Sequence, residues 1–316
     1  MQLSGIHHLT AISGAIRENH RFYTRTLGMR LVKRTVNQDD VSAYHLFYAD
    51  GKGSPGTDLT FFGWQAPRER RGTRSIVRTC LRVDGNDALE WWVHRFDEEK
   101  AHHGDILEID GRLTLMFEDP EGQRLALIDD KGQGDAPTPW DGSPIPREKQ
   151  IRGLGPIVIS LPTLGPTDAL LTDVYNMRQV RDYPHPDNPA TRVHVFEMGN
   201  GGAHAELHAA VQPDLPVASQ GAGGVHHVAF RSSDIDYDTW ADRLTEFRIP
   251  NSGKVNRFWF RSLYVREPNG ILFEIATDGP GFGIDEDPSK LGEELVLPPF
   301  LEAQRDSIIA NLEKLD

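Results

Sequence analysis

Closely similar patterns of apolar and polar residues predict two short strands at opposite ends of the chain. Residues 5–13 read GIHHLTAIS, and residues 224–232 read GVHHVAFRS. Each is followed by apolar residues at the three-to-four spacing of an amphipathic helix, over 16–27 and over 237–247. A glycine and a proline then supply helix stops. The chain therefore contains a repeated strand–helix unit.

A second repeated phrase predicts the last hairpin of a unit. Residues 117–127 read FEDPEGQRLAL, and residues 265–275 read VREPNGILFEI. Pro-x-Gly supplies a tight turn whose glycine accepts a positive φ, and a strand then begins. Counting outward from the two phrases gives four βαβββ modules, at 1–66, 67–130, 153–215 and 222–280. The Gly-, Pro- and Asp-rich residues 131–152 are predicted to be a linker, and 281–316 a C-terminal tail.

Shorter patterns predict further elements. Strands are expected at 43–48 and 262–265, and the second module should carry a helix over Ala88–His103 that ends at the surface with His102 and His103. The tail should form a helix after Pro299. Its docking stripe is expected to consist of Leu301, Ile308, Leu312 and Leu315.

Comparison of the modules separates shared scaffold from candidate chemistry. Only the first and fourth modules carry a His-His pair in the opening strand, whereas the third has Val158 where His8 and His227 stand. In the last hairpin, Glu274 of the fourth module stands where the second module has Ala126. The residues that only the first and fourth modules carry form the candidate site.

Two histidines and one carboxylate on rigid strands are typical of the facial triad of non-haem Fe(II) oxygenases. Such a triad leaves coordination positions free for substrate and O2. A closed structural site would use four protein ligands, typically with cysteines, and Cys80 is the single cysteine. We therefore predict one divalent metal on His8, His227 and Glu274. The first and fourth modules must then meet, and the second and third should pair as a metal-free barrel.

Within each His-His pair, strand alternation lets only one side chain face the metal. We choose the second histidine, because His8 then shares a face with the small Thr10, and His227 with Ala229. By strict alternation the first histidine of each pair points away, although a twisted strand end could still bring its edge near the site.

Glu206 is the alternative carboxylate, because it alternates with His204 and His208 near the last hairpin of the third module. The opening strand of the second module offers it no histidine partner. Either it belongs to a second metal site, or it lies on a solvated strand face.

Composition narrows the classes of function. The chain is 38% hydrophobic and 26% charged, as expected of a globular protein, and its net charge of −13 argues against polyanionic partners such as nucleic acids. No apolar run is long enough to cross a membrane, and the start lacks the pattern of a secretion signal. With one cysteine and no such signal, we expect a cytoplasmic location.

Several longer phrases carry a family resemblance that extends over nearly the whole chain. They are IHHLT (6–10), LVKRT (31–35), YHLFYAD (44–50), GSPGT (53–57), LEWW (89–92), GVHHVAF (224–230), NR (256–257), YVR (264–266) and the 281–291 tail. Together they resemble the vicinal oxygen chelate superfamily, which includes glyoxalases, bleomycin resistance proteins and extradiol dioxygenases. Within it, the chain is similar to two-domain ring-cleaving dioxygenases related to hydroquinone dioxygenases.

The resemblance implies an α+β fold of four βαβββ modules paired into two open barrels. It implies Fe(II) on the predicted triad, with Mn(II) as an alternative, and opening of a hydroquinone or catechol ring by O2. It also implies roles near the substrate for His7, Thr10, His226, Arg257 and Tyr264. There are two rival functions. One is a glyoxalase-type isomerase, which usually has a fourth protein ligand; the first module offers only Asp58 for it. The other is a protein that sequesters a small molecule. A homo-oligomeric state is left open.

Overall fold

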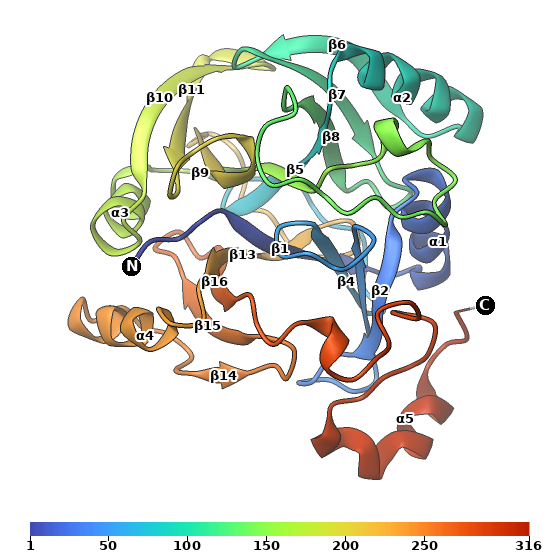
Figure 1. Ribbon diagram of the computed structural model, residues 1–316. Coiled ribbons are helices and arrows are strands. Elements are labelled where there is room, and N and C mark those ends of the chain that lie inside the picture. Colours follow the sequence, from blue (N-terminus) through green and yellow to red (C-terminus); the bar gives the residue numbers. More distant parts are fainter. Residues whose placement is uncertain (316) are drawn as a thin grey trace.

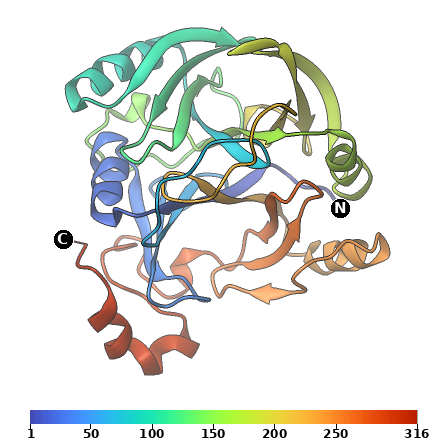
Figure 2. The ribbon, with the colours of Figure 1, turned by 180° about the vertical axis from the view of Figure 1, so that it is seen from behind.

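Two curved eight-stranded sheets, stacked one above the other, make up most of the computed structural model, which describes residues 1–315 (Figures 1 and 2). The first sheet has the spatial order β14 (Val255–Asn256), β15 (Arg261–Arg266), β16 (Leu272–Thr277), β13 (Val225–Ser232), β1 (Ile6–Ser13), β4 (Asp58–Gly63), β3 (Tyr44–Ala49) and β2 (Arg30–Val36). The second has the order β10 (Arg178–His185), β11 (Asn188–Glu197), β12 (Glu206–Val211), β9 (Leu154–Leu161), β5 (Ser75–Val83), β8 (Arg124–Asp129), β7 (Arg112–Glu118) and β6 (His103–Ile109).

The strand order joins the first four strands of the chain to the last four. In the first sheet β1 and β13 run antiparallel at the centre, and each pairs in parallel with the last strand of its own repeat, β4 or β16. In the second sheet β5 and β9 take the same central place, flanked by β8 and β12. This confirms the predicted α+β fold of two open barrels, in which the outer repeats pair with each other and the inner repeats pair likewise.

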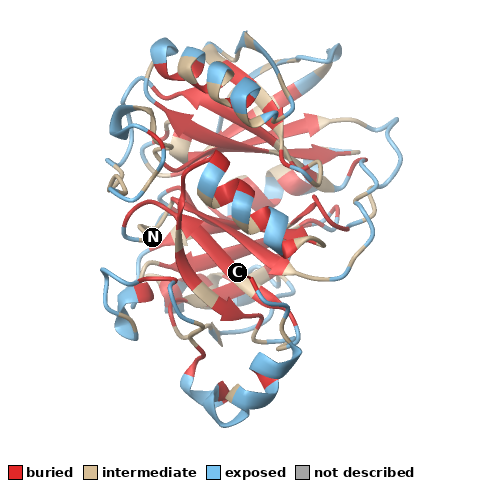
Figure 3. Cartoon of the chain, turned by 90° about the vertical axis from the view of Figure 1, so that its right-hand side faces the viewer, coloured by how far each residue is buried: buried red, intermediate tan, exposed pale blue. Residues whose placement is uncertain are grey.

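The helices lie on the outside of the sheets and expose their polar faces (Figure 3). They are α1 (Ile16–Arg21), which continues as a π-helical turn over Phe22–Thr26, α2 (Asn86–Glu99), α3 (Gly165–Ala169), which continues as a π-helical turn over Leu170–Val174, α4 (Tyr237–Glu246) and α5 (Arg305–Asn311). Short 3-10 helices occur at Arg147–Lys149, Ala203–Ala205, Phe282–Ile284 and Pro299–Gln304.

One hydrophobic cluster extends through both sheets. It includes Leu9 and Phe230 from the central strands of the first sheet and Leu81 and Leu154 from those of the second, all of them fully or almost fully buried. Strand residues alternate between faces. The neighbouring side chains of His8, Thr10 and Ala229 therefore lie on the opposite face of the first sheet.

The Pro-x-Gly turns fasten one repeat to the helix of another. In the turn before β8, Asp119 accepts a hydrogen bond from the Tyr23 hydroxyl at 3.2 Å, and Glu121 accepts one from the Gly14 amide at 2.8 Å. In the turn before β16, Glu267 accepts a hydrogen bond from Thr167 of α3. The two turns thus join the two sheets to each other.

The tail returns across the outer edge of the first sheet, where Figure 1 shows it in orange-red. Lys33 of β2 is fully buried there, and its ammonium group contacts the carboxylates of Asp285, at 2.8 Å, and Glu286. Asp285 also accepts a hydrogen bond from the indole of Trp259 at 3.0 Å. The tail therefore holds β2 and the β14–β15 connection together.

Three predicted details need correction. The second-module helix begins at Asn86 and ends at Glu99, because Lys100 adopts a left-handed conformation, and His103 starts β6. The tail helix is divided into a 3-10 and an α-helical piece, although Leu301, Ile308 and Leu315 are buried as expected. The third correction concerns the register of β9.

Strand register puts Pro156, not Val158, at the position of the metal-site histidines. Val158 pairs with His208 in β12, as Ala229 pairs with Glu274 in β16. Val158 is therefore the counterpart of Ala229, and the residue two positions earlier, Pro156, is the counterpart of His227. The opening glycine of the third module is accordingly Gly153.

Candidate metal centre

Three strands of the first sheet bring the predicted triad together. His8 lies on β1, His227 on β13 and Glu274 on β16, which are consecutive neighbours in the sheet. One ligand atom from each residue lies within 4.8 Å of those of the other two. Glu274 Oε2 is 3.3 Å from His8 Nε2 and 3.0 Å from His227 Nε2. All three side chains are buried.

The other carboxylate oxygen of Glu274 is fixed by the sheet. Ser262 of β15 donates a hydrogen bond to Oε1, while Oε2 has no hydrogen-bond donor although it is buried. A buried acceptor without a donor is costly unless something else compensates its charge. Oε2 is therefore the atom of Glu274 that is free to bind a cation.

Each His-His pair is joined by a hydrogen bond between its two Nδ1 atoms. The distance is 2.8 Å between His7 and His8 and 2.7 Å between His226 and His227. A metal-binding histidine commonly donates a hydrogen bond from its other ring nitrogen to a partner, and this bond orients the ring. The first histidine of each pair is in the position to be that partner, and each second histidine keeps Nε2 toward Glu274.

Two β-bulges explain why both histidines of a pair reach the same side. In β1, Ile6 and His8 pair with successive residues of β13, so His7 is the extra residue. In β13, His227 and Val225 pair with the successive residues Thr10 and Ala11 of β1, so His226 is the extra residue. A bulge interrupts the alternation of side chains between faces. The expectation that His7 and His226 point away is therefore wrong, and the structure places both beside the triad.

A chain of hydroxyl groups leads away from His227. Thr10 Oγ1 lies 3.1 Å from His227 Nε2 and 2.8 Å from Thr60 Oγ1, and Thr60 Oγ1 lies 3.0 Å from His45 Nε2. Thr10 was predicted for the site, whereas His45 was not. The sequence offered one indication of His45: alternation in β3 places its side chain on the other face of the strand from the buried Tyr44 and Leu46.

A small cavity of about 40 Å³ opens above the triad, between β3, β4 and the β14–β15 connection. It is lined by His8, His227, Tyr264, Arg257, His45, Phe47, Phe62, Trp259, Phe260 and residues 37–39. Phe260, another residue that the sequence did not single out, lies with its ring centroid 5.1 Å from that of His8. The walls are mainly aromatic, which suits a flat ring.

Tyr264 and Arg257 stand together at one side of the cavity. Arg257 Nε donates a hydrogen bond to the Tyr264 hydroxyl at 3.1 Å, and its outer nitrogens bind Asp39 at 2.8 and 3.2 Å. Burial raises the pKa of Tyr264, so the phenol is neutral at neutral pH. The structure thus brings both predicted residues to the cavity, with Arg257 already in contact with one carboxylate.

Burial and neighbouring groups shift the pKa values of His227, Glu274 and the first histidine of each pair. Burial lowers the pKa of His227, although the nearby Glu274 opposes this shift. Burial alone would raise the pKa of Glu274, but the His8 and His227 imidazoles outweigh it and hold the pKa well below its usual range. Burial also lowers the pKa of His7 and of His226 to about 3. Burial therefore favours the neutral form of His227, and the contacts with the two histidines favour the ionised form of Glu274.

Sequence and structure comparisons support the family of the chain. A family model described as the Glyoxalase/Bleomycin resistance protein/Dioxygenase superfamily matches residues 5–167 and 153–275. The chain belongs to this superfamily.

Its relatives in the superfamily include dioxygenases that match it from end to end. The Bacillus subtilis (strain 168) protein named "Putative ring-cleaving dioxygenase MhqA" is 43% identical, and the match covers 100% of both chains. The chlorohydroquinone/hydroquinone 1,2-dioxygenase of Sphingobium indicum is 29% identical over 98% of this chain and 96% of its own. A crystal structure described as a "putative dioxygenase" from B. subtilis superposes with a TM-score of 0.90 at 32% identity, covering 100% of this chain and 98% of that one.

The superfamily fold is also seen in more distant structures. Glyoxalase I from Zea mays superposes with a TM-score of 0.64 at 13% identity, covering 87% of this chain and 92% of that one. At this identity the likeness concerns the fold alone. Within residues 1–315, no helix is long and apolar enough to cross a membrane.

In this superfamily member, Glu206 lies in a different environment from Glu274. It is fully buried, so the expectation of a solvated strand face is wrong. Arg112 binds both of its oxygens at 2.7 Å, Arg181 binds Oε1 at 3.0 Å, and His208 Nε2 lies 2.9 Å from Oε2. Asp110, Glu206 and His208 form a second group of potential ligands, but the two guanidinium groups already neutralise its carboxylates.

Proposed function

We propose that the chain is an Fe(II)-dependent ring-cleaving dioxygenase that opens a hydroquinone- or catechol-type aromatic diol with O2. The observation that carries this proposal is the convergence of His8 Nε2, His227 Nε2 and Glu274 Oε2 at the floor of an aromatic-lined cavity. Two imidazoles and one carboxylate on one side of a site, with the other side open, are the ligand set of non-haem Fe(II) oxygenases. Mn(II) can be held by the same donors.

The ligand atoms fit a divalent cation. Glu274 Oε2 is buried without a hydrogen-bond donor and faces two imidazole nitrogens, so three acceptors converge when each Nδ1 carries the proton. His7 and His226 accept those Nδ1 protons and thereby hold the rings in place. When bound, Fe(II) would supply Lewis acidity toward a substrate hydroxyl and electron transfer with O2.

The protein's own groups would bind and orient the diol. Phe260 lies beside His8 and Phe62 beside His227, and both rings line the cavity, where they can pack against a flat ring. The neutral Tyr264 phenol can donate a hydrogen bond to a substrate oxygen or pass a proton to it. Arg257 holds that phenol at 3.1 Å and adds positive charge where negative charge develops on the substrate.

Thr10, Thr60 and His45 form a hydrogen-bonded chain beside the triad. Their hydrogen bonds, of 2.8 and 3.0 Å, connect Thr10 to the imidazole of His45 at the cavity wall. Burial and the neighbouring imidazoles of His8 and His227 lower the pKa of His45 well below its usual range, so it is a neutral acceptor. We assign Thr10 the role of positioning a substrate hydroxyl beside His227.

The glyoxalase-type rival lacks one protein ligand. The position in β4 that corresponds to Glu274 is Thr60, because Thr60 pairs with Thr10 as Glu274 pairs with Ala229. Asp58, two residues earlier, is not among the grouped ligand atoms at the triad. A binding protein that merely sequesters an aromatic molecule would have no use for the buried triad.

Oxygen uptake tests the proposal. The metal-free protein should be loaded anaerobically with Fe(II), Mn(II) or Zn(II) and mixed with hydroquinone or catechol at an oxygen electrode. We expect O2 consumption with Fe(II) and none with Zn(II), loss of activity on oxidation, and recovery with ascorbate and ferrous salt. Isomerase activity with Zn(II) and no O2 consumption would reject the dioxygenase in favour of the glyoxalase-type reaction. Binding without turnover under every condition would favour a sequestering protein.

A further inference from the structure

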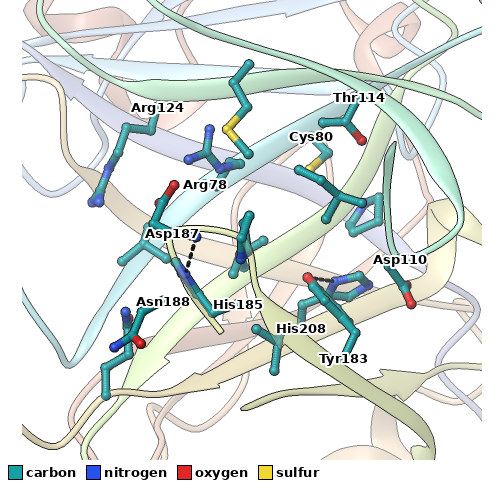
Figure 4. A pocket seen from close by; sticks show the side chains of 18 of the residues that line it. Arg78, Cys80, Asp110, Thr114, Arg124, Tyr183, His185, Asp187, Asn188 and His208 are labelled. Atoms are coloured by element: carbon teal, nitrogen blue, oxygen red, sulfur yellow. Dashed lines mark hydrogen bonds between the residues drawn. The ribbon is translucent and has the colours of Figure 1, made fainter. Parts of the chain in front are cut away.

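The second sheet encloses a larger cavity than the candidate metal centre. Its volume is about 390 Å³, and residues of β5 to β12 line it (Figure 4). Cavities of this size commonly hold small organic ligands. None of the proposed steps of ring cleavage uses it.

This cavity lies at the position that the internal repeat assigns to the metal pocket. Cys80 pairs with Ala126 in β8 as Thr10 pairs with Thr60 in β4, so Arg78 is the counterpart of His8. By the same register His208 is the counterpart of Glu274. Where the first sheet has a metal ligand, the second therefore has a guanidinium group.

The charge of Arg78 is not compensated by a nearby carboxylate. Arg71, Arg112 and Arg124 also line the cavity, and they are 2.8, 2.7 and 3.8 Å from the carboxylates of Glu118, Glu206 and Glu69. Within residues 1–315, by contrast, Arg78 makes no ion pair, and its contact with the Leu125 carbonyl is long, at 3.4 Å. Asp110 and Asp187 are the acidic residues of the lining, and Asp110 is bound by Arg181. Among the described residues of the lining, the charged groups without an ion pair are thus Arg78 and the exposed Asp187 at the rim.

The rest of the lining is mostly apolar and has one polar corner. Val77, Met116, Ile128, Val158, Val193 and Leu215 contribute apolar walls. Opposite Arg78, the Tyr183 hydroxyl and His208 Nδ1 are hydrogen-bonded at 2.9 Å, and both point toward the cavity in Figure 4. The tip of the β10–β11 hairpin, with His185 and Asp187, forms part of the rim.

We propose that this cavity is a second ligand site, which binds a small organic carboxylate with an aromatic or conjugated skeleton through Arg78. A guanidinium group matches the planar carboxylate with two parallel hydrogen bonds. The apolar walls take the skeleton. The Tyr183 hydroxyl oxygen can accept a hydrogen bond from a polar substituent at the far end, because its proton is donated to His208 Nδ1, whose ring donates from Nε2 to Glu206. A phosphate fits less well, because a single uncompensated guanidinium and apolar walls supply too few donors for a dianion. This inference does not depend on the proposed ring cleavage.

Calorimetric titration tests the site with two probes, cinnamate for an aromatic acid and sorbate for an open-chain acid, and with cinnamyl alcohol as the neutral comparator. We expect at least one acid to bind the parent protein and the alcohol to bind at least about tenfold more weakly, since about 1.4 kcal/mol of ion pairing corresponds to tenfold. Arg78→Gln should weaken binding of the acid at least about tenfold. Arg192→Gln, an exposed arginine of β11 outside the cavity, should leave it unchanged. Tighter binding of cinnamate or of sorbate tells which skeleton the cavity accepts.

Two further variants locate the bound acid. Val158→Phe places a ring inside the cavity and should abolish binding, whereas His8→Ala, in the other sheet, should not affect it. Circular dichroism checks that each variant is folded. Absence of binding by both acids, equal binding of acid and alcohol, or binding that survives Arg78→Gln but is lost in His8→Ala would overturn the proposal.

Discussion

Thr60 and Glu274 occupy the same position in repeat-related strands. Each pairs in parallel with the residue two places after a triad histidine, Thr10 for Thr60 and Ala229 for Glu274. The internal repeat thus provides two places from which a carboxylate could reach the metal, and the chain uses one. The hydroxyl at the other place instead bonds to Thr10 and His45.

Thr60→Glu should therefore add a fourth protein ligand. We expect the variant to retain metal at least as firmly as the parent, while O2 uptake with an aromatic diol falls by about 10- to 100-fold, the range typical of changes around a metal. The reason is that the new carboxylate fills a position needed by substrate or O2. Metal analysis and the oxygen electrode measure the two effects. Unchanged O2 uptake in a metal-loaded variant would contradict the three-ligand site.

Glu274→Ala should lose both metal and turnover and still fold, because alanine occupies the equivalent position of β8 as Ala126. Glu206 provides the matched comparison. Glu206→Gln should keep the metal, but it should unfold at lower urea concentration, since breaking a buried charge pair costs about 3–5 kcal/mol. Metal analysis by mass spectrometry and urea titration separate the outcomes. Loss of metal from the Glu206 variant, with metal retained in the Glu274 variant, would move the site to the second sheet.

The two members of a His-His pair should differ in their effect on metal affinity. His8→Ala removes a ligand and should leave no stoichiometric metal. His7→Ala removes only the partner of Nδ1 and should weaken binding about 10- to 100-fold without abolishing it. Competition with a chelator gives both affinities. If the His7 variant were metal-free and the His8 variant loaded, the choice within the pair would be wrong by one residue.

Lys33 should contribute strongly to stability. It is fully buried against Asp285 and Glu286 of the tail, so Lys33→Met leaves two carboxylates without their partner and should lower the free energy of unfolding by about 3–5 kcal/mol. Urea titration measures this loss. Lys52→Met, at an exposed turn, is the control and should change stability little. Equal effects of the two substitutions would show that the tail is not held by this contact.

Asp119 should make stability depend on pH in the acidic range. Burial is the main cause that raises its pKa to about 6, against backbone hydrogen bonds that oppose the shift, whereas the ordinary value is 3.8. Between these values the folded chain binds more protons than the unfolded chain, so this contribution to stability is full below about pH 4 and is lost as pH rises through about 6. Relative to Asp119→Asn, the parent should therefore be most stable at low pH. A constant difference in urea midpoint from pH 4 to 7 would contradict this assignment.

The repeat in the sequence was sufficient to predict the pairing of the modules and the triad that the structure brings together. It was not sufficient for the register of the third module. Shifting a strand by two residues keeps every side chain on its face, so alternation fits Val158 and Pro156 equally well. The positive φ of Gly153, which matches that of Gly5, distinguishes the two registers and is visible only in the structure.

Other features depend on partners that are distant in the sequence. Alternation cannot reveal the bulges at His7 and His226, because a bulge is a property of two paired strands. The burial of Glu206 likewise depends on Arg112 and Arg181, which arrive from β7 and β10. His45 was overlooked because its hydrogen bond runs through Thr60 to a strand from the start of the chain.

The pairing of β1 with β13 has a consequence for biosynthesis. The strand β1, which carries His8, leaves the ribosome early. Its neighbour β13 and the strand β16, which carries Glu274, are among the last to appear. Until then one edge of β1 has no partner, and an unpaired strand edge invites pairing with other chains. A nascent or truncated chain that stops before β13 should therefore aggregate and contain no triad, so any metal must be acquired after synthesis is nearly finished.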